Sequence, residues 1–541
     1  MPPTHEVFNQ PSPLEDYDVA DDAALTEGIE REGAGWAAGE LSELGKLAGS
    51  AAAHGWAEQA NVNEPVLRTH DRYGNRIDEV DFHPAWHVLT DTAVAHGLHA
   101  APWAEDRPGA HVARAAKFFV WSQNEAGHGC PMSMTYAAIP ALRHSPGLAK
   151  QFEPLLTARS YDFGLRPPHT KQGLLAGMSM TEKQGGSDVR AGTTQAVPAP
   201  DGTYRLRGHK WFTSAPMGDL FLTLAQSPEG LGCFLVPRVL EDGSRNALVI
   251  QRLKDKLGNR SNASAELEYD GALAWPVGDP EHGVRTIIEM VNSTRLDCVI
   301  GSAAGMRAAL GQAVHHTSQR YVFGRALLEQ PLMRNVLADL ALESEAATTL
   351  MLRLAGSTDR AIGGDAEEIA FRRLAVAVGK FWVTKRQAPH VAEALECLGG
   401  NGYVEESGMP RLFRESPLNS IWEGAGNVAA LDVLRAIERE PDSIAALLAE
   451  LDLAAGGDIR LDAAVTRLRA ELADTDGIKY RARSVVELMA LCLQGALLVR
   501  HAPPAVADAF VASRLGDGRG HVFGTLDRAA DVGAIIDRNR P

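Results

Sequence analysis

The chain has 541 residues, of which 45% are hydrophobic and 23% are charged, and its formal net charge is −16. This length suggests about three or four domains, and the composition excludes a chain that is disordered throughout. The negative balance argues against a globally basic nucleic-acid-binding protein. The five cysteines are scattered and never form a C-x-x-C pair, which argues against a disulfide framework or a structural zinc site.

The first residues, MPPTHEVFNQPSPLEDYD, are acidic and proline-rich and lack the apolar segment of a signal peptide. Near the other end, the longest uninterrupted apolar stretch covers residues 488–499. That is about 12 residues, whereas a membrane-spanning helix needs about 20. We therefore expect a cytoplasmic protein without a membrane partner. No motif such as H-E-x-x-H occurs, and we expect no metal site.

Helical periodicity dominates residues 1–176, which we predict to be an N-terminal helical domain with helices at 111–122 and 142–156. The pattern changes in residues 177–280, where short β-rich runs are separated by turns that contain Asp-Gly pairs. These runs predict an antiparallel barrel or sandwich. The predicted strands are 202–214, 220–225, 232–236 and 265–269.

Helical periodicity returns at residue 281 and continues to the end of the chain. Residues 281–440 predict a helical bundle, and residues 441–541 a helical extension. The predicted helices are 284–306, 333–355, 367–398, 444–453 and 484–499. The fold class is therefore α+β multidomain, with an N-terminal helical domain, a central antiparallel β domain, and a C-terminal helical bundle that carries a helical extension.

Charge is unevenly distributed along the chain. Residues 461–541 carry 11 basic and 10 acidic side chains, a balance of +1, while the first 460 residues have a balance of −17. Two interpretations fit this difference: the tail is an ordinary solvated helical region, or it keeps a basic face for a polyanion. Composition does not distinguish them.

The most informative segment is GMSMTEKQGGSDV, residues 177–189, which opens the β region. Its G-G-S sequence leaves backbone N–H groups and a hydroxyl accessible, so it can surround a phosphate or the polar edge of a ring. The strand KWFT, residues 210–213, adds the flat indole of Trp211. Together they suit a large planar heterocycle. The ordinary alternatives are a surface turn and a core tryptophan.

Three further segments combine glycine with charged or aromatic residues. NSIWEGAGN (419–427) places Glu423 beside an indole, which can desolvate a carboxylate as a general base requires. LGGNGY (398–403) follows a long helix, and RYVFGR (320–325) offers an arginine that could clamp a diphosphate. Each has an ordinary alternative: a loop glutamate, a glycine C-cap, and a helix C-terminus with favourable cations. No G-x-G-x-x-G follows a strand, which disfavours a Rossmann nicotinamide site.

The order and spacing of these segments resemble the acyl-CoA dehydrogenase family: M-T-E-x-x-x-G-S-D, K-W-F-T, R-x-x-F-G, L-G-G-N-G-Y and then W-E-G. Further segments resemble the AidB branch of that family, which comprises flavoproteins of the adaptive response to DNA alkylation. They are REGAGW (31–36), ANVNEP (60–65), FHPAWH (82–87), TEKQGGSDV (181–189), RLKDKLGNRSNAS (252–264) and NSIWEG (419–424). The resemblance extends over about residues 5–440, and the tail has the expected length but matches weakly.

The resemblance implies non-covalent FAD and gives roles to individual positions. Glu423 corresponds to the base that takes the α-proton of an acyl thioester while the flavin accepts the β-hydride. The residues that would bind FAD in the same subunit are Met180, Thr181, Gly186, Ser187, Trp211 and Thr213 in the β domain, and Trp422, Gly424 and Asn427 in the bundle. Those that would reach the FAD of a neighbouring subunit are Arg320, Phe323, Gly399 and Gly400. The last group implies an oligomer, for which we expect a homotetramer.

The chain departs from the usual family pattern at several positions. After the base the family has Gly-Thr-x-Gln, whereas this chain has Gly-Ala-Gly-Asn, ending at Asn427. The glutamines that usually precede L-G-G-N-G and follow R-x-x-F-G are replaced by Glu396 and Pro331. These changes imply altered contacts on the adenosine side of FAD. Thr294 stands where isovaleryl-CoA dehydrogenases carry their base, which leaves Glu423 as the candidate base.

The resemblance leaves three functions open. The first is a metabolic acyl-CoA dehydrogenase for a short or branched acyl chain, and the third is a scaffold with a structural flavin. The second is an AidB-type protein that binds FAD and double-stranded DNA, without strong sequence preference, and protects DNA from alkylation, with weak or vestigial dehydrogenase activity. The tail favours the second. Arg435 stands where that branch has a DNA-contacting arginine; the alternative is a solvated arginine. Weaker candidates are Arg481, Arg483 and Arg514.

Overall fold

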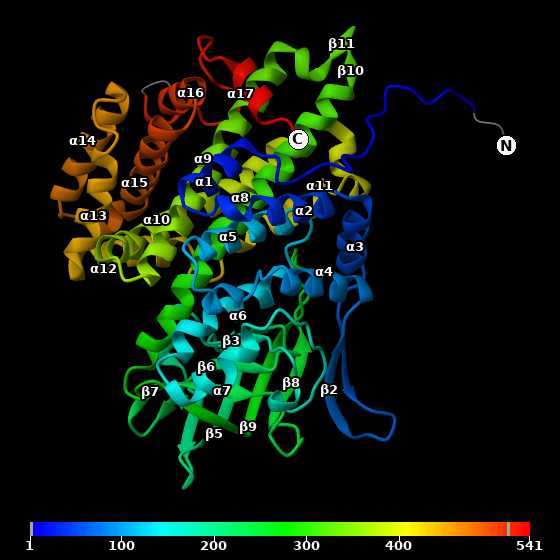
Figure 1. Ribbon diagram of the computed structural model, residues 1–541, viewed down its shortest axis with the longest axis vertical. Coiled ribbons are helices and arrows are strands. Elements are labelled where there is room, and N and C mark those ends of the chain that lie inside the picture. Colours follow the sequence, from blue (N-terminus) through cyan, green and yellow to red (C-terminus); the bar gives the residue numbers. More distant parts are fainter. Residues whose placement is uncertain (1–3, 517–519) are drawn as a thin grey trace. The chain divides into compact units, whose positions relative to one another are not determined.

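Residues 4–516 and 520–541 are described by a computed structural model (Figure 1). The chain forms two compact units, neither of which is continuous in sequence. One, here called the sheet unit, comprises Ala52–Ala110 and Glu125–Asp297. The other, the bundle unit, comprises Met1–Ala51, His111–Asn124 and Cys298–Pro541.

The sheet unit is built on seven strands. They are β3 (Ala176–Ser179), β4 (Gln195–Pro198), β5 (Tyr204–Ser214), β6 (Leu220–Ser227), β7 (Gly230–Pro237), β8 (Leu248–Leu253) and β9 (Ser264–Val277). The strands pair in the order β3-β6-β4-β5-β9-β7, with β8 on β9, and β7 also pairs with β6, so the sheet closes into a barrel. Most pairs are antiparallel, as predicted, but β3–β6 and β4–β6 are parallel.

The side chains that point inward from the strands fill the interior of the barrel. Successive residues of a strand point to opposite faces, and on β5 the buried Tyr204 and Leu206 alternate with the exposed Arg205 and Arg207. The interior therefore forms from the period-2 pattern that predicted these strands.

Helices and a hairpin complete the sheet unit. The helices are α3 (Ala51–Val62), α4 (Pro84–Ala95), α6 (Gly129–Leu142) and α7 (Pro146–Leu156), and the hairpin pairs β1 (Val66–His70) with β2 (Arg76–Asp81). The hairpin was not predicted. Its turn is held by Asp71, whose carboxylate accepts hydrogen bonds from the backbone N–H groups of Tyr73 and Asn75. The predicted helix at 142–156 is interrupted, because α7 starts afresh with Pro146 in its first turn.

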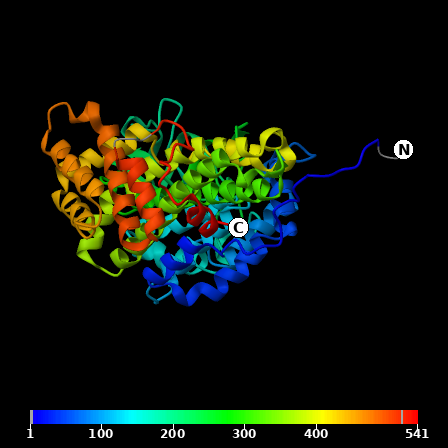
Figure 2. The same ribbon diagram turned by 90° about the horizontal axis from the view of Figure 1, so that it is seen from above.

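The bundle unit is organised around three long helices: α8 (Gly283–Gln319), of which it contains the part from Cys298 onward, α9 (Pro331–Ile362) and α10 (Ala366–Cys397). Its other helices are α1 (Ala23–Arg31), α2 (Ala38–Ala48), α5 (Ala110–Ser122), α11 (Met409–Glu415), α12 (Gly426–Arg439), α13 (Pro441–Asp452), α14 (Ile459–Ala473), α15 (Ile478–His501), α16 (Pro504–Leu515) and α17 (Val532–Arg538). In the extension, α14, α15 and α16 lie side by side (Figures 1 and 2).

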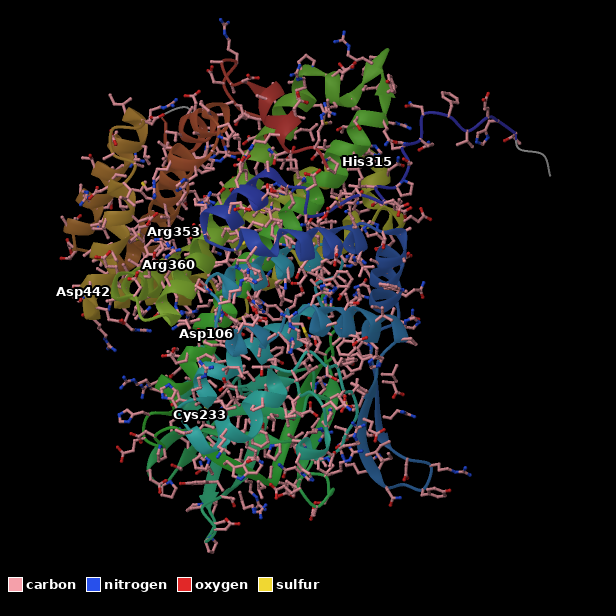
Figure 3. All side chains as sticks on the ribbon, viewed as in Figure 1. Asp106, Cys233, His315, Arg353, Arg360 and Asp442 are labelled. Carbon is pink, nitrogen blue, oxygen red and sulfur yellow. The ribbon has the colours of Figure 1, made fainter. Side chains whose placement is uncertain are left out.

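Buried ion pairs connect the extension to the long helices. Arg353 of α9 contacts Glu368 of α10 at 3.0 Å and Glu450 of α13 at 2.8 Å. Arg500 of α15 also contacts Glu450, at 2.7 Å. Figure 3 labels Arg353 together with Arg360, two turns further along α9, which contacts Glu368 at 2.8 Å. The extension is therefore tied to the bundle by charges that are largely removed from water.

Helix α15 has the length and hydropathy of a membrane-spanning helix, with a mean hydropathy of 1.6 over its most apolar window. Of that window, 78% is buried inside the protein, as in a core helix. The structure thus continues the predicted apolar stretch at 488–499 into a helix of 24 residues. All five cysteines are buried, and none is in a disulfide.

Candidate active site

A buried carboxylate anchors the loop between β3 and β4, which carries the predicted flavin-binding residues Met180, Thr181, Gly186 and Ser187. Glu182 accepts hydrogen bonds from the Lys210 ammonium at 2.8 Å, from the Thr194 hydroxyl at 2.6 Å and from the backbone N–H of Thr193 at 2.6 Å. Burial alone would raise the pKa of Glu182, but the bonds from Lys210 and the threonines hold it well below its usual range. The pair fixes the loop on the strand that carries Trp211.

A β-bulge in β5 re-orients the aromatic residues next to this loop. Lys210 pairs with Leu267 of β9 and Thr213 with Ala265, so three steps along β5 match two along β9. Simple alternation would place Phe212 on the buried face with Lys210. Instead, Phe212 is 50% exposed and Thr213 is fully buried. The bulge therefore presents the neighbouring aromatic residues outward while keeping the strand paired.

Trp211 is held from two sides. Its backbone N–H donates to the carbonyl of Thr181 at 2.8 Å, which joins the strand to the loop. The Lys254 ammonium lies 3.3 Å from the centre of the indole, in cation–π contact. Lys254 and Arg252 both contact the carboxylate of Glu266 at 2.6 Å. The segment 252–264, which marks the AidB branch, thus supplies the cation on the indole.

The remaining predicted residues of the sheet unit lie along the same loop. Met180 and Thr181 are half-buried, and Ser187 is exposed. A Cβ atom on Gly186 would lie 2.6 Å from the hydroxyl oxygen of Thr181, so glycine allows the loop to fold back over that hydroxyl. Thr213 is hydrogen-bonded to Ser179 inside the barrel. The structure therefore brings these residues to one loop and its neighbouring strands.

In the bundle unit, Glu423 lies in a loop with unusual backbone geometry between Leu418–Ser420 and α12. Its φ is +57°, and that of Gly424 is +103°. A non-glycine residue in this region costs roughly 1 kcal/mol or more, and such strain is frequent at functional sites. The carbonyl of Gly424 accepts a hydrogen bond from the buried ammonium of Lys380 on α10. This contact helps to hold the loop in its strained form.

A chain of hydrogen bonds fixes the other side of the loop. The indole N–H of Trp422 donates to the side-chain carbonyl of Asn419 at 2.9 Å. The amide of Asn419 donates in turn to the hydroxyl of Ser302 on α8 at 3.2 Å. The loop around Glu423 is thus attached to both α8 and α10.

Arg320 and Phe323 belong to a tight hairpin that follows α8, formed by β10 (Tyr321–Val322) and β11 (Arg325–Ala326). Phe323 and Gly324 both have positive φ, +51° and +83°, which is typical of a type I′ turn. The turn leaves Phe323 97% exposed. Arg320 donates to the carbonyl of Asn9 in the N-terminal segment. The arginine therefore has a partner within its own subunit.

Gly399 and Gly400 follow the end of α10. Gly399 has a φ of +60°, so it serves as the glycine C-cap considered in the sequence interpretation. Both glycines are exposed and begin a short 3₁₀ turn, Gly399–Tyr403.

The arginines considered for DNA contact differ in exposure. The Arg435 side chain on α12 is 55% exposed and lies 3.4 Å from Asp432. Arg481 is half-buried and paired with Glu471. Arg514 is only 14% exposed and contacts Asp339 at 2.5 Å, so it is not available as a surface contact.

Three residues that hold the candidate loops were not predicted: Glu182, Lys210 and Lys380. Glu182 and Lys210 lie inside the motifs M-T-E and K-W-F-T. Their presence in these motifs could have identified both as residues that hold the loop. Lys380 lies in the middle of α10, and no local pattern connects it to Gly424.

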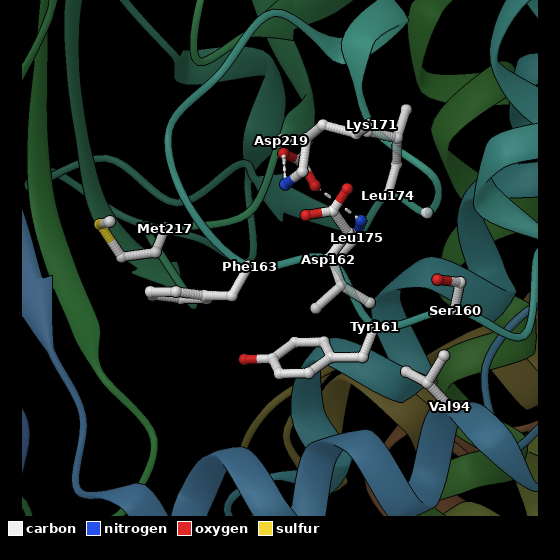
Figure 4. Close-up of a pocket in the computed structure, with 11 residues that line it drawn as sticks. Val94, Ser160, Tyr161, Asp162, Phe163, Lys171, Leu174, Leu175, Met217 and Asp219 are labelled. Carbon is white, nitrogen blue, oxygen red and sulfur yellow. Dashed lines mark hydrogen bonds and ion pairs between the residues drawn. The ribbon is translucent and has the colours of Figure 1, made fainter.

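A small pocket elsewhere in the sheet unit contains none of the predicted residues (Figure 4). Lys171 and Asp219 form a buried ion pair there at 2.6 Å. Burial raises the pKa of Asp219 to about 6, against the opposing effect of the Lys171 ammonium. In residues 4–516 and 520–541, no group of three or more His, Cys, Asp or Glu side chains is arranged to hold a metal ion.

The sequence of the chain matches known protein families. Residues 9–163 match the adaptive response protein AidB N-terminal domain, 177–272 the acyl-CoA dehydrogenase middle domain, and 281–438 the acyl-CoA dehydrogenase C-terminal domain. AidB of Escherichia coli K12 is 47% identical over 526 residues, which cover 96% of each chain.

Two solved structures share the fold. Caenorhabditis elegans ACDH-11 in complex with C11-CoA has a TM-score of 0.85 at 29% identity, covering 99% of this chain and 93% of that one. An acyl-CoA dehydrogenase from Bacillus anthracis, complexed with FAD, has a TM-score of 0.66 at 18% identity, covering 80% of this chain and 81% of that one; it shows the fold alone.

These matches define the fold as that of the acyl-CoA dehydrogenases, as the sequence predicted. The chain belongs to the acyl-CoA dehydrogenase family and carries an AidB-type N-terminal domain. FAD, the cofactor expected from the sequence, is the cofactor that this family uses. The residues present fit it: the loop folded back at Gly186 offers hydroxyls and backbone donors, and the neighbouring strand offers an indole.

Proposed function

We propose that this protein is an AidB-type flavoprotein that binds FAD and double-stranded DNA and protects DNA from alkylation, with weak acyl-CoA dehydrogenase activity. The observation that carries the proposal is the 47% identity to AidB over 96% of the chain, because this match includes most of the extension, 441–541. The retained Glu423 is the reason to include dehydrogenation rather than a purely structural flavin.

In this proposal the residues that the resemblance assigns to FAD lie on the β3–β4 loop and β5 of the sheet unit, and, in the bundle unit, on the loop before α12 and in its first turn. The residues are Met180, Thr181, Gly186, Ser187, Trp211, Thr213, Trp422, Gly424 and Asn427. Arg320, Phe323, Gly399 and Gly400 reach the FAD of a neighbouring subunit. An aromatic side chain that is 97% exposed, as Phe323 is, supports a role in contacting a partner. When bound, FAD supplies the acceptor for the β-hydride of the substrate.

Glu423 is the base. A general base, such as a carboxylate, can take the α-proton of an acyl thioester only if it lies within reach of that proton. The loop that carries Glu423 is held by Lys380 through Gly424 and by Asn419 through Trp422, which limits where the carboxylate can point. Because a free enolate is strongly basic, its oxygen needs hydrogen-bond donors, and the hydride must leave as the proton is removed.

DNA binding is assigned to an exposed ridge of α12. Arg435 and Arg439 are one turn apart, about 6 Å along the helix axis, and both are exposed. Arginines so placed contact phosphates without reading bases. The net charge of −16 gives no long-range attraction to DNA, so binding depends on this local ridge and on its repetition in an oligomer.

A metabolic acyl-CoA dehydrogenase is the second candidate. The observation that favours it is the similarity to ACDH-11 over 99% of the chain, since that protein was solved with C11-CoA.

Two measurements on the purified protein test the proposal. Its absorption spectrum should show bound flavin, and titration with unrelated duplexes should show binding that weakens steeply between about 50 and 200 mM salt. A protein that stays colourless after FAD is added contradicts the flavoprotein assignment. Rapid flavin reduction by an acyl-CoA, together with no DNA binding at low salt, would establish the metabolic alternative.

A further inference from the structure

A second cavity of the sheet unit lies on the outer face of the barrel, between β9, α7 and the loop that joins β7 to β8. Its volume is about 350 Å³, which is within the range of small-molecule sites. Alternation along β9 places Ala272 and Ala274 inside the barrel. Leu273 and Trp275 therefore point outward, where both are half-buried and line the cavity. Outward positions of a barrel that faces water are usually polar, so an apolar pair there is typical of a binding surface.

Helix α7 forms the other apolar wall of the cavity. Its buried residues Ala149, Phe152 and Leu156 follow helical spacing, so one face of the helix packs on the barrel. Phe152 is 2% exposed, and the centre of its ring lies 5.8 Å from that of the Trp275 indole. The indole is thus held on one side by a buried ring, while part of its surface is accessible from the cavity.

The loop between β7 and β8 closes a third side, and hydrogen bonds fix it against β9. The side-chain amide of Asn246 donates to the carbonyl of Pro237 at 2.8 Å and to that of Leu273 at 2.9 Å. Its side-chain carbonyl accepts from the backbone N–H of Leu273 at 2.8 Å. Walls held by such bonds lose little conformational freedom when a ligand binds.

The charge around the mouth of the cavity is negative. Glu241 and Asp242 are exposed there, and in the described part of the chain the only other ionisable residue that lines the cavity is His169. Hydrogen bonds from the hydroxyl and N–H of the nearby serine lower the pKa of Asp242, so this carboxylate is ionised at neutral pH. Arg245, in the same loop, contacts Glu79 at 2.7 Å instead. The two carboxylates at the mouth therefore lack a cation among the lining residues.

We propose that this cavity binds a small organic cation with a planar apolar body. The face of an indole attracts a cation, and Trp275 offers that face beside the apolar side chains of Phe152 and Leu273. Glu241 and Asp242 complement the charge of the ligand. The same carboxylates repel the phosphates of nucleic acids, FAD and CoA. The site is therefore separate from those of the proposed function and goes beyond it.

Calorimetric titration of the full-length protein at pH 8 tests the site with three bicyclic probes of similar shape. They are N-methylquinolinium, a cation, quinoline, which is neutral at this pH, and 2-naphthoate, an anion. Wild type should bind the cation about tenfold or more tightly than the other two. Glu241→Lys should reduce the affinity for the cation by about tenfold or more and increase that for 2-naphthoate, and Trp275→Leu should also weaken binding of the cation.

Glu268→Lys is the matched control, because it changes the net charge equally at an exposed position of β9. It lies seven residues before Trp275, about 23 Å along the strand, and should titrate like wild type. The proposal is overturned if wild type binds no probe, if it binds quinoline as tightly as the cation, or if Glu241→Lys titrates like the control. Because Glu241 is exposed, its exchange tests the site even if Trp275→Leu, which loses the contact with Phe152, does not fold. Circular dichroism of each variant checks the fold.

Discussion

Glu423 is the residue on which the proposed dehydrogenation depends. Glu423→Gln keeps the shape of the side chain but removes its ability to take a proton. We expect flavin reduction by an acyl-CoA to slow by about 10²- to 10⁴-fold while FAD stays bound. The measurement is anaerobic bleaching of the flavin absorption. Glu438→Gln, an exposed carboxylate on α12, is the control and should bleach like wild type. Equal bleaching by Glu423→Gln would show that another group is the base.

The Glu182–Lys210 pair affects stability rather than chemistry. Both side chains are at most 2% exposed. Glu182→Gln leaves the Lys210 ammonium buried without its counter-charge, and we expect a loss of about 3 to 5 kcal/mol in the free energy of unfolding at pH 7. The double variant with Lys210→Met should recover much of that loss. Urea unfolding measures both.

The pH dependence of this pair has a definite sign. The pKa of Glu182 in the folded protein lies below its ordinary value of 4.5. Its stabilising contribution is therefore fully present above about pH 4.5 and is lost as the pH falls below it. The difference between wild type and Glu182→Gln should narrow in acid, and a difference that stays constant from pH 7 to pH 3 would exclude an ionised pair.

At the scale of elements, α9 and α10 pack around a buried histidine, which also makes the fold less stable in acid because it stays neutral when folded. His390 contacts the carbonyl of Leu340 at 3.0 Å. Burial lowers its pKa to about 4, against the opposing effects of that carbonyl and of Glu343. The unfolded chain binds a proton near pH 6.5 and the folded chain near pH 4, so stability falls as the pH drops between these values. At pH 5 the loss in the free energy of unfolding amounts to about 2 kcal/mol.

His390→Gln keeps a donor for the Leu340 carbonyl but does not titrate. The loss of stability between pH 7 and pH 5, measured by urea unfolding, should therefore shrink by about 2 kcal/mol in this variant. His282→Gln, at an exposed histidine, is the control. An unchanged pH dependence in His390→Gln would mean that His390 does not stay neutral in the fold.

The types of element and their order were predictable because each depends on a local period in the sequence. Elements that lack a local period could not be predicted, and the hairpin at 66–81 is an example. The bulge in β5 depends on pairing with β9 and overrides the alternation that would bury Phe212. In the candidate site, Glu423 was predicted from the sequence of its own loop. Lys380 and Arg483 donate hydrogen bonds to that region and reach it only through helix packing, across 44 and 56 residues of sequence.

At the scale of the whole molecule, the exposed hairpin predicts assembly. We expect a homotetramer, with a mass by light scattering near four times 58.0 kDa. Phe323→Ala should lower the FAD content per chain without unfolding it, because its ring would contact the cofactor of a neighbour. Tyr73→Ala, an exposed aromatic residue in another turn, is the control. A monomer that holds FAD at full occupancy would contradict the roles of Arg320 and Phe323.

Assembly also determines how an acidic protein can hold DNA. A chain with a net charge of −16 must rely on several weak phosphate contacts, and a tetramer repeats the α12 ridge. Arg435→Ala should therefore lower affinity by a similar factor for unrelated duplexes and reduce the salt dependence, while FAD content stays unchanged. Arg68→Ala is the matched control, because both side chains are 55% exposed and paired with an aspartate. A loss of affinity for only one DNA sequence would exclude a phosphate contact at Arg435. An equal loss of affinity in Arg435→Ala and Arg68→Ala would exclude it as well.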